Sequence, residues 1–216
     1  MMNEKNKHIL LWVLAVVPLI VTILYYDKLP EKIPMHWNTL GEVDRMDNKF
    51  PGAFIMPVLV LAIPLMMAFL PKIDPRRANY TAFKGAYYWF QLCFVVLFGS
   101  MSIFVLMVSL GYNIIRVDTF VKLVVGIMIT VFGNLMPKLK NNYFAGIRTP
   151  WTLANEEVWF STHRLAGKMW FAAGIVMIAL SFIPGQVTAI LYFSTIILAA
   201  FIPVVYSYFR FRKVSR

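Results

Sequence analysis

Six apolar runs alternate with polar segments along the chain. The runs cover residues 9–26, 53–70, 86–111, 119–136, 169–184 and 187–209. Each is close to the ~20 residues that a helix needs to cross ~30 Å of hydrocarbon, although the fifth is shorter. The pattern therefore predicts six transmembrane helices. A tight turn at residues 184–186 makes the last two of them antiparallel neighbours.

The composition agrees with a membrane location. Hydrophobic residues make up 60% of the 216 residues and charged residues 14%, whereas a soluble domain has about 25% charged residues. The first run follows Lys5 and Lys7 as in a signal peptide, but it ends at Asp27 without a small-x-small cleavage site. It is therefore expected to stay as the first membrane helix. The sequence predicts an all-α, multi-pass protein of the cell membrane.

The basic residues predict the orientation. If the N-terminus lies inside, the inside segments hold 15 of the 21 Lys and Arg residues and the outside segments hold six. Because positive charge favours the cytoplasmic side, both termini are predicted to be cytoplasmic. The net charge of +11 then reflects topology and attraction to anionic lipid headgroups. It does not indicate direct binding to nucleic acid.

We expect one membrane domain in two parts. Residues 1–85 contain the first two helices and an ordered outer loop at 27–52, and residues 86–216 contain four helices with a polar cytoplasmic segment at 134–168. The outer loop holds five of the ten acidic residues, and residues 38–41 are typical of a turn. Residues 35–38 are expected to form a short strand or an interfacial segment.

The polar segment at 134–168 begins on a helix that has small residues on one face. Gly126, Thr130 and Gly133 recur at intervals of four and three, a spacing that lets a neighbouring helix approach closely. Further along, Asn155 is a candidate N-cap, with acidic residues at 156 and 157 in the first turn. A helix from about residue 155 either lies on the membrane surface as an amphipathic segment or bends into the fifth span.

Most catalytic chemistry has no signature in the sequence. Cys93 is the single cysteine, so an intramolecular disulfide and a cysteine-based metal site are excluded. The three histidines form no H-E-x-x-H pair, and no cofactor motif is present. The chain is predicted not to be an enzyme. Two alternatives stay open: a small peptide or lipid transporter or channel, and a membrane enzyme in which Arg148, Glu157 and His163 meet.

Four stretches carry a resemblance to a known family. They are Gly133-Asn134 with Met136-Pro137-Lys138, NYFAGIRTPWTL at 142–153, EEVW at 156–159 and THRLAGK at 162–168. In order and spacing they resemble the SdpI (SdpI/YfhL-like) family of Gram-positive membrane proteins. The stretch LPEKIPMHWNTLGEVD at 29–44 resembles the extracytoplasmic module found with that family. The resemblance implies a six-helix protein that gives immunity to a membrane-active peptide toxin.

The resemblance also implies partners and binding residues. The partners are membrane lipid, a peptide toxin of bacteriocin or sporulation-delaying type, and a small repressor that the protein retains at the membrane for signalling. The predicted binding residues of the polar segment are Asn134, Asn142, Tyr143, Arg148, Pro150, Trp151, Glu156, Glu157, Trp159, His163, Arg164 and Lys168. Those of the outer loop are His36, Trp37, Asn38 and Glu42.

Overall fold

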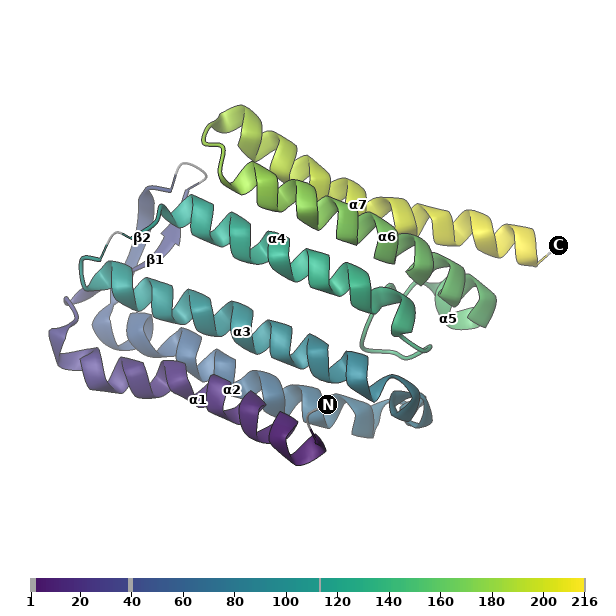
Figure 1. Cartoon of the computed structure of the whole chain (residues 1–216), viewed down its shortest axis with the longest axis horizontal. Coiled ribbons are helices and arrows are strands. Elements are labelled where there is room, and N and C mark those ends of the chain that lie inside the picture. Colours follow the sequence, from purple (N-terminus) through teal and green to yellow (C-terminus); the bar gives the residue numbers. More distant parts are fainter. Residues whose placement is uncertain (1–2, 39–40, 113, 216) are drawn as a thin grey trace. The chain divides into compact units, whose positions relative to one another are not determined.

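The computed structural model describes residues 3–38, 41–112 and 114–215. The fold is mostly helical (79%), and six helices in the described residues are long and apolar enough to cross a membrane. They are α1 (Glu4–Tyr25), α2 (Lys49–Ile73), α3 (Lys84–Ser109), α4 (Val117–Leu135), α6 (Glu156–Ser181) and α7 (Gln186–Val214) (Figure 1). The predicted six membrane helices are confirmed.

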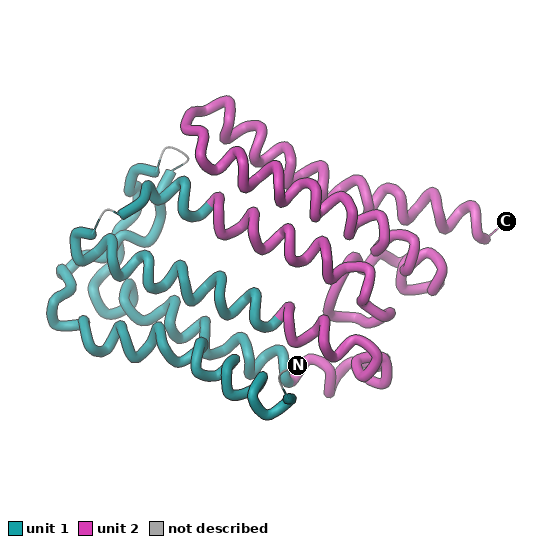
Figure 2. The backbone as a smooth tube through the Cα atoms, viewed as in Figure 1, with its two compact units in different colours: residues 1–68, 91–121 teal, residues 69–90, 122–216 magenta. Residues whose placement is uncertain are grey.

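The chain forms two compact units, coloured separately in Figure 2. Unit 1 comprises Met1–Ala68 and Gln91–Val121, and unit 2 comprises Phe69–Phe90 and Lys122–Arg216. Helices α2, α3 and α4 each run from one unit into the other. The division predicted between residues 85 and 86 stays a prediction.

Unit 1 contains a small antiparallel sheet, so the expectation of an all-α fold is wrong in detail. Strand β1 (Lys32–Trp37) pairs with β2 (Val43–Asn48) in the outer loop, with two register irregularities. Ile33 is 1% exposed and packs with Leu29, Ala53 and Leu106. A methyl group at Gly52 would lie 2.6 Å from the Ile33 Cβ. The Ile33 side chain thus anchors the sheet against the start of α2.

The loop of this hairpin contains the turn expected at 38–41. The backbone N–H of Gly41 donates to the Asn38 carbonyl at 3.0 Å, and that of Asn38 donates to the Glu42 carbonyl at 2.9 Å. Gly41 has φ of 83°, a conformation that glycine adopts without steric cost. The central residues of the predicted turn, 39 and 40, lie outside the described part of the chain.

In unit 2, α4 and α6 approach each other across glycines. A methyl group at Gly126 would lie 3.0 Å from the backbone nitrogen of Ile178, and one at Gly174 would lie 2.8 Å from the Gly126 carbonyl oxygen. Near the other end, a methyl group at Gly133 would lie 2.8 Å from the Cα of Phe171. These contacts confirm the close packing that the small-residue spacing predicts.

Helix α6 settles the two alternatives for the segment from residue 155. The Asn155 side chain accepts from the backbone N–H groups of Glu157 at 2.8 Å and Val158 at 3.1 Å, so it is the predicted N-cap. From there one helix continues to Ser181. A separate helix on the membrane surface is therefore wrong, and the fifth span begins at residue 156 rather than 169. No proline occurs between residues 156 and 181. Polar side chains of this helix are buried against the segments described below.

Candidate functional site

A hydrogen-bonded loop follows α4 in unit 2. Helix α4 closes with the 3-10 turn η3 (Met136–Lys138), and the short helix α5 covers Pro150–Ala154. We call residues 139–149 between them the polar loop. Asn142 is fully buried, and its side-chain oxygen accepts from the N–H groups of Phe144 at 2.9 Å and Ala145 at 2.6 Å. Its amide nitrogen donates to the Lys140 carbonyl at 2.8 Å. Asn142 thus satisfies backbone groups that have no helix or strand partner.

Two aromatic rings of α6 fasten the polar loop. The Trp159 indole N–H donates to the Leu139 carbonyl at 2.9 Å, and the Ile147 N–H donates to Nε2 of His163 at 3.0 Å. The other ring nitrogen of His163 lies 2.8 Å from the Trp159 carbonyl. Because Nε2 accepts and a carbonyl can only accept, the proton of a neutral His163 sits on Nδ1. The two rings stack with centroids 4.0 Å apart.

Helix α5 is capped at its start and packs against α7. Thr149 caps it, accepting from the Thr152 N–H at 3.2 Å, while the Thr149 N–H donates to the Thr152 hydroxyl at 2.9 Å. The Thr149 hydroxyl also lies 3.1 Å from that of Ser207 in α7. The Trp151 ring meets the Tyr208 ring edge-on at 5.1 Å. The end of α7 and the polar loop therefore form one packed cluster.

A second segment, residues 74–83 between α2 and α3, also grips the polar loop. Asp74 is only 2% exposed. Its carboxylate accepts from the N–H of Arg76 at 2.7 Å, the Tyr80 hydroxyl at 2.8 Å and the N–H of Tyr143 at 2.9 Å. No ion pair to Asp74 occurs among the described residues. Three donors take the place of a cation in stabilising this buried carboxylate.

Arg76 and Asn79, in the same segment, also form hydrogen bonds to the polar loop and to α5. The Arg76 guanidinium donates to the side-chain oxygen of Asn141 and, at 2.8 Å, to the Leu153 carbonyl. The same guanidinium lies 5.1 Å from the centre of the Tyr143 ring. The Asn79 amide donates to the Asn141 carbonyl at 2.6 Å. The backbone of the polar loop is therefore fixed from two sides, by α6 and by residues 74–83.

The structure separates the predicted binding residues of the polar segment by exposure. Asn142, Trp159 and His163 are fully buried, and their polar atoms bond inside the fold. Trp151 is partly exposed. The exposed members are Asn134, Tyr143, Arg148, Pro150, Glu156, Glu157, Arg164 and Lys168. Ligand binding by any of them stays a prediction, but only the exposed and partly exposed ones can meet a partner without unfolding the loop.

The three groups considered for a membrane enzyme are engaged elsewhere. Both ring nitrogens of His163 bond within the fold, and Glu157 forms an ion pair with Arg210. Arg148 donates to the Tyr143 carbonyl at 2.8 Å. General acid–base catalysis needs groups within ~2.6–3.2 Å of one another or of a shared water. The contacts of these three side chains do not assemble such a constellation.

The predicted residues of the outer loop lie on the hairpin of unit 1. His36 Nδ1 is 2.6 Å from a carboxylate oxygen of Asp44, and both side chains are exposed. The Asn38 amide donates to the Glu42 carboxylate at 2.8 Å, and the Glu42 N–H donates to the Asn38 oxygen at 3.0 Å. Trp37 ends β1 and is partly exposed. Asn38 and Glu42 close the hairpin, whereas His36 is presented on its surface.

The roles of Asp74, Arg76, Asn79 and Tyr80 were not predicted from the sequence. Arg76 entered the prediction only as one of the basic residues that indicate orientation, because the contacts to the polar loop join residues more than 60 positions apart. A local signal was present. Asp74 is an acid followed by proline in a segment that otherwise carries only basic charges, and Asp-Pro after an apolar run is typical of a turn that uses its own carboxylate.

The fold and these contacts define a multi-pass helical membrane protein with a packed polar loop after its fourth span. Residues 138–207 match the sequence model of the SdpI/YfhL protein family, and residues 13–61 match that of a domain of unknown function (DUF1648). The chain is 28% identical over 210 residues to the immunity protein SdpI of Bacillus subtilis (strain 168), covering 97% of this chain and 98% of that protein. These matches confirm the resemblance to the SdpI/YfhL family that the motifs of the chain indicated.

The family match also supports a cell-membrane location, as predicted for this six-span chain. No solved structure matches the chain. The family match covers the end of η3, the polar loop, α5, α6 and most of α7. The second match covers most of α1, β1, β2 and the start of α2. Apart from Asn134, the predicted binding residues of both regions therefore lie inside matched segments.

Proposed function

We propose that this chain is a membrane immunity protein that protects its host cell from a membrane-active peptide toxin. The observation that carries the proposal is the match to the immunity protein SdpI, because it extends over 97% of the chain and therefore includes both candidate binding regions. The protein acts by binding and not by catalysis. The engagement of Arg148, Glu157 and His163 within the fold supports this part of the proposal.

The proposed orientation places both termini and the polar loop in the cytoplasm and the β1–β2 hairpin outside. The split of 15 inside to six outside basic residues supports it. In this orientation the hairpin is the part of the chain that a toxin arriving from outside meets first. His36 and Trp37 are its proposed contact residues, with Asn38 and Glu42 shaping the turn beside them.

The polar loop is the proposed cytoplasmic binding surface. Its backbone is held by the contacts of Asp74, Arg76, Trp159 and His163. A surface fixed before binding loses little conformational freedom on binding, which favours affinity. The proposed contact residues, on the polar loop and on the helices beside it, are the exposed and partly exposed members of the polar segment: Asn134, Tyr143, Arg148, Pro150, Trp151, Glu156, Glu157, Arg164 and Lys168. A small repressor protein held at the membrane is the proposed partner here, which would couple toxin contact to signalling.

Survival of a toxin-sensitive strain that produces the protein tests this assignment. Wild type is compared with His36→Ala/Trp37→Ala in the hairpin and with Arg148→Ala/Trp151→Ala beside the polar loop. Lys72→Ala, at an exposed position at the end of α2, is the matched control, and membrane levels of all variants are equalised. We expect the hairpin pair to lower survival and the control to leave it unchanged.

The same experiment separates protection from signalling. If the polar loop serves a repressor, Arg148→Ala/Trp151→Ala lowers induction of a reporter under the repressor and leaves survival at the wild-type level. Survival that is unaffected by producing the wild-type protein, across a panel of membrane-active peptides, would contradict the immunity proposal. Uptake of labelled peptide into proteoliposomes would instead favour the transporter alternative.

A further inference from the structure

Helix α6 carries an exposed basic stripe in unit 2. Arg164 and Lys168 are both exposed and lie one turn apart on the helix. Residues four apart share a face of a helix. Phe171 and Ile175 continue the same stripe toward the far end of α6 and are exposed apolar residues. The exposed face of α6 therefore changes from apolar to basic between residues 171 and 168.

The contacts between α6 and α7 show which residues of α7 lie at the same level as Arg164 and Lys168. The Trp170 indole N–H donates to the Ala199 carbonyl at 2.8 Å, and Glu157 pairs with Arg210. The two helices are antiparallel, so positions between these contacts are matched by counting along each helix. Lys168 is then level with about residue 200 of α7, and Arg164 is level with about residue 204.

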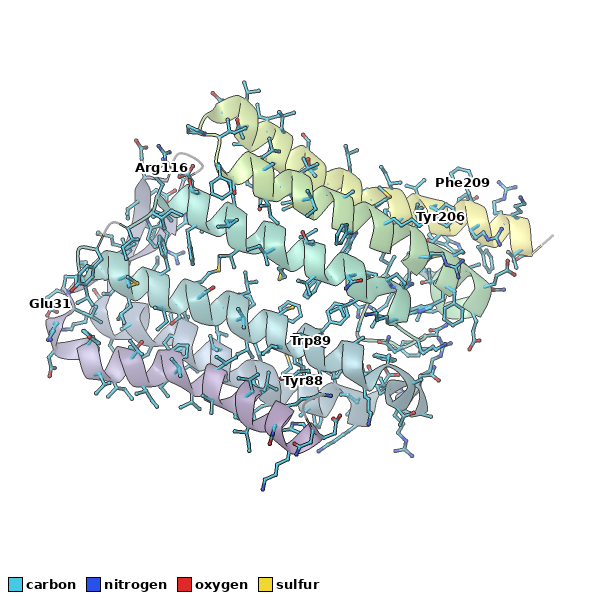
Figure 3. All side chains as sticks on the ribbon, viewed as in Figure 1. Glu31, Tyr88, Trp89, Arg116, Tyr206 and Phe209 are labelled. Carbon is cyan, nitrogen blue, oxygen red and sulfur yellow. The ribbon has the colours of Figure 1, made fainter. Side chains whose placement is uncertain are left out.

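Helix α7 remains apolar well beyond that level. Its exposed residues Phe201, Ile202, Val205 and Phe209 continue the apolar surface up to Arg210. Figure 3 labels Phe209, which projects away from the ribbon. From Val187 to Phe209, α7 covers ~33 Å at 1.5 Å per residue, close to the ~30 Å thickness of the hydrocarbon core. The edge of the bilayer along α7 therefore lies at Arg210.

Lys168 lies inside this edge. Residues 200 to 210 of α7 correspond to ~15 Å of helix, whereas a lysine stem reaches only roughly 6 Å toward the water. Arg164, about six residues from the edge, is nearer to the interface. An exposed ammonium group at the depth of Lys168 is costly in hydrocarbon, so water and a counter-charge must reach it on this face of α6.

The surroundings of the stripe are also basic. The Lys140 ammonium lies 4.7 Å from the centre of the Phe160 ring, one turn of α6 from Arg164. Lys138 is exposed at the end of η3, where Pro137 meets Gly167. Of the two acids at the start of α6, Glu157 already pairs with Arg210, and Glu156 is exposed in the first turn. The stripe thus needs an anion from outside the protein.

We propose that the basic stripe, with Lys138 and Lys140, binds the phosphate of an anionic phospholipid at a place where the bilayer is indented against α6. Pro137 meets Gly167, so α4 and η3 end at about the level of Lys168, and the polar loop extends from there to the level of Trp159, whose indole donates to the Leu139 carbonyl. Irregular backbone at membrane depth is tolerated only when it is buried in protein or borders water. The indentation and the hydrogen-bonded packing of the polar loop satisfy this condition together. The proposal does not depend on the immunity function.

Alkylation of single cysteines in lipid vesicles tests the depth argument. In a Cys93→Ala background, Lys168→Cys is compared with Ala200→Cys, an exposed position at the same level on α7. Maleimides react with thiolates, which form in water and not in hydrocarbon. We expect a small hydrophilic maleimide to modify residue 168 at least tenfold faster than residue 200. Equal rates at the two positions, fast or slow, would overturn the indentation.

Lipid retention tests the ligand. The full-length protein is purified from vesicles of phosphatidylcholine with phosphatidylglycerol, and the lipid retained per protein is measured by mass spectrometry. We expect Arg164→Gln/Lys168→Gln to retain several-fold less phosphatidylglycerol, with phosphatidylcholine unchanged, while Arg164→Lys/Lys168→Arg retains the wild-type amount. Lys72→Gln/Lys84→Gln, which removes two exposed charges elsewhere in unit 2, should also behave as wild type.

Three results would contradict lipid binding. Equal phosphatidylglycerol retention by Arg164→Gln/Lys168→Gln and wild type would show that the stripe does not hold the lipid. Displacement of the lipid by millimolar inorganic phosphate would show that a free anion suffices. A loss that Lys72→Gln/Lys84→Gln reproduces would reduce the effect to net charge. Circular dichroism of each variant establishes that the helices are intact before retention is compared.

Discussion

Replacement of Asp74 by asparagine probes the grip of residues 74–83 on the polar loop. The carboxylate accepts three hydrogen bonds at 2.7–2.9 Å, from the Arg76 N–H, the Tyr80 hydroxyl and the Tyr143 N–H. An amide of nearly the same shape keeps one acceptor oxygen and turns the other into an NH₂ group. That NH₂ group must face either the Arg76 N–H, or the Tyr80 hydroxyl and the Tyr143 N–H together. At least one backbone donor then loses its partner in a site that is 2% exposed.

The expected cost follows from the bonds that are lost. A hydrogen bond to a charged group contributes about 1.5–3 kcal/mol, and a buried donor left unpaired costs about 1–3 kcal/mol. These ranges describe the same lost contact from two sides, so they are not added. We expect Asp74→Asn to lower the free energy of unfolding by about 2–3 kcal/mol, measured by denaturant titration in mild detergent. Asp74→Ala, which removes all three acceptors, should cost more.

A double-mutant cycle with Tyr80→Phe isolates the side-chain bond. Tyr80→Phe alone should cost about 1–2 kcal/mol, because it removes one hydrogen bond to a charged group. In the Asp74→Ala background the same change should cost clearly less, because the carboxylate is absent and only the longer contact of the Tyr80 hydroxyl with the Asn142 side-chain oxygen, at 3.4 Å, remains. Lys72→Gln serves as a control at an exposed position two residues away. An effect of Asp74→Asn within about 0.5 kcal/mol of that control would show that the hydrogen bonds of Asp74 do not stabilise the contact between residues 74–83 and the polar loop.

Three further substitutions test other contacts of unit 2 by the same titration. Gly133→Ala should destabilise the protein by about 1–3 kcal/mol, because the added methyl would lie 2.8 Å from the Phe171 Cα, whereas Gly85→Ala, with nothing within 4 Å, should not; equal effects would contradict the close packing. Asn155→Ala should lower the free energy of unfolding by about 1 kcal/mol, and Asn155→Asp should lower it much less. Equal effects of the two substitutions would show that the Asn155 cap does not stabilise α6. His163→Phe keeps the stacked ring but leaves the Ile147 N–H unpaired, so it should cost about 1–3 kcal/mol; a neutral result would remove the fastening role of His163.

Hydrophobic length was sufficient to predict the six membrane helices. A run of ~20 apolar residues has few alternatives to a spanning helix, since every backbone polar group must be satisfied within it. The N-cap at Asn155 was equally accessible, because capping depends on residues within one turn. The glycine spacing on α4 predicted a close helix contact, although it could not name α6 as the partner. These features depend on local sequence or on the bilayer.

The features that the sequence did not predict depend on distant contacts. Residues 156–168 are polar enough to suggest a break before the fifth span, yet α6 is continuous because the polar loop and residues of α4 and α7 bury one side of it. Strand β2 shows little alternation and is almost entirely exposed. Its position follows from pairing with β1, which Ile33 anchors.

The sequence predicted the region of the candidate site, but not which of its residues support the fold and which are exposed for binding. The motifs located residues 134–168 as the polar segment, and its exposed members remain the proposed contact residues. A polar or aromatic side chain that supports the fold cannot be distinguished, in a single sequence, from one that is exposed for binding. Only the burial of Asn142, Trp159 and His163 assigns those three to support. The role of Asp74 required knowledge of which loop lies beside it.

The most direct test of the proposed immunity function is the concentration of a membrane-active peptide that kills half of a sensitive population, with and without this protein at a measured membrane level. We expect the wild-type protein to raise this concentration for at least one peptide of a panel. We expect His36→Ala/Trp37→Ala, at the same membrane level, to return it toward the value without the protein. An unchanged lethal concentration for every peptide, with the wild-type protein present in the membrane, would contradict the proposed immunity function.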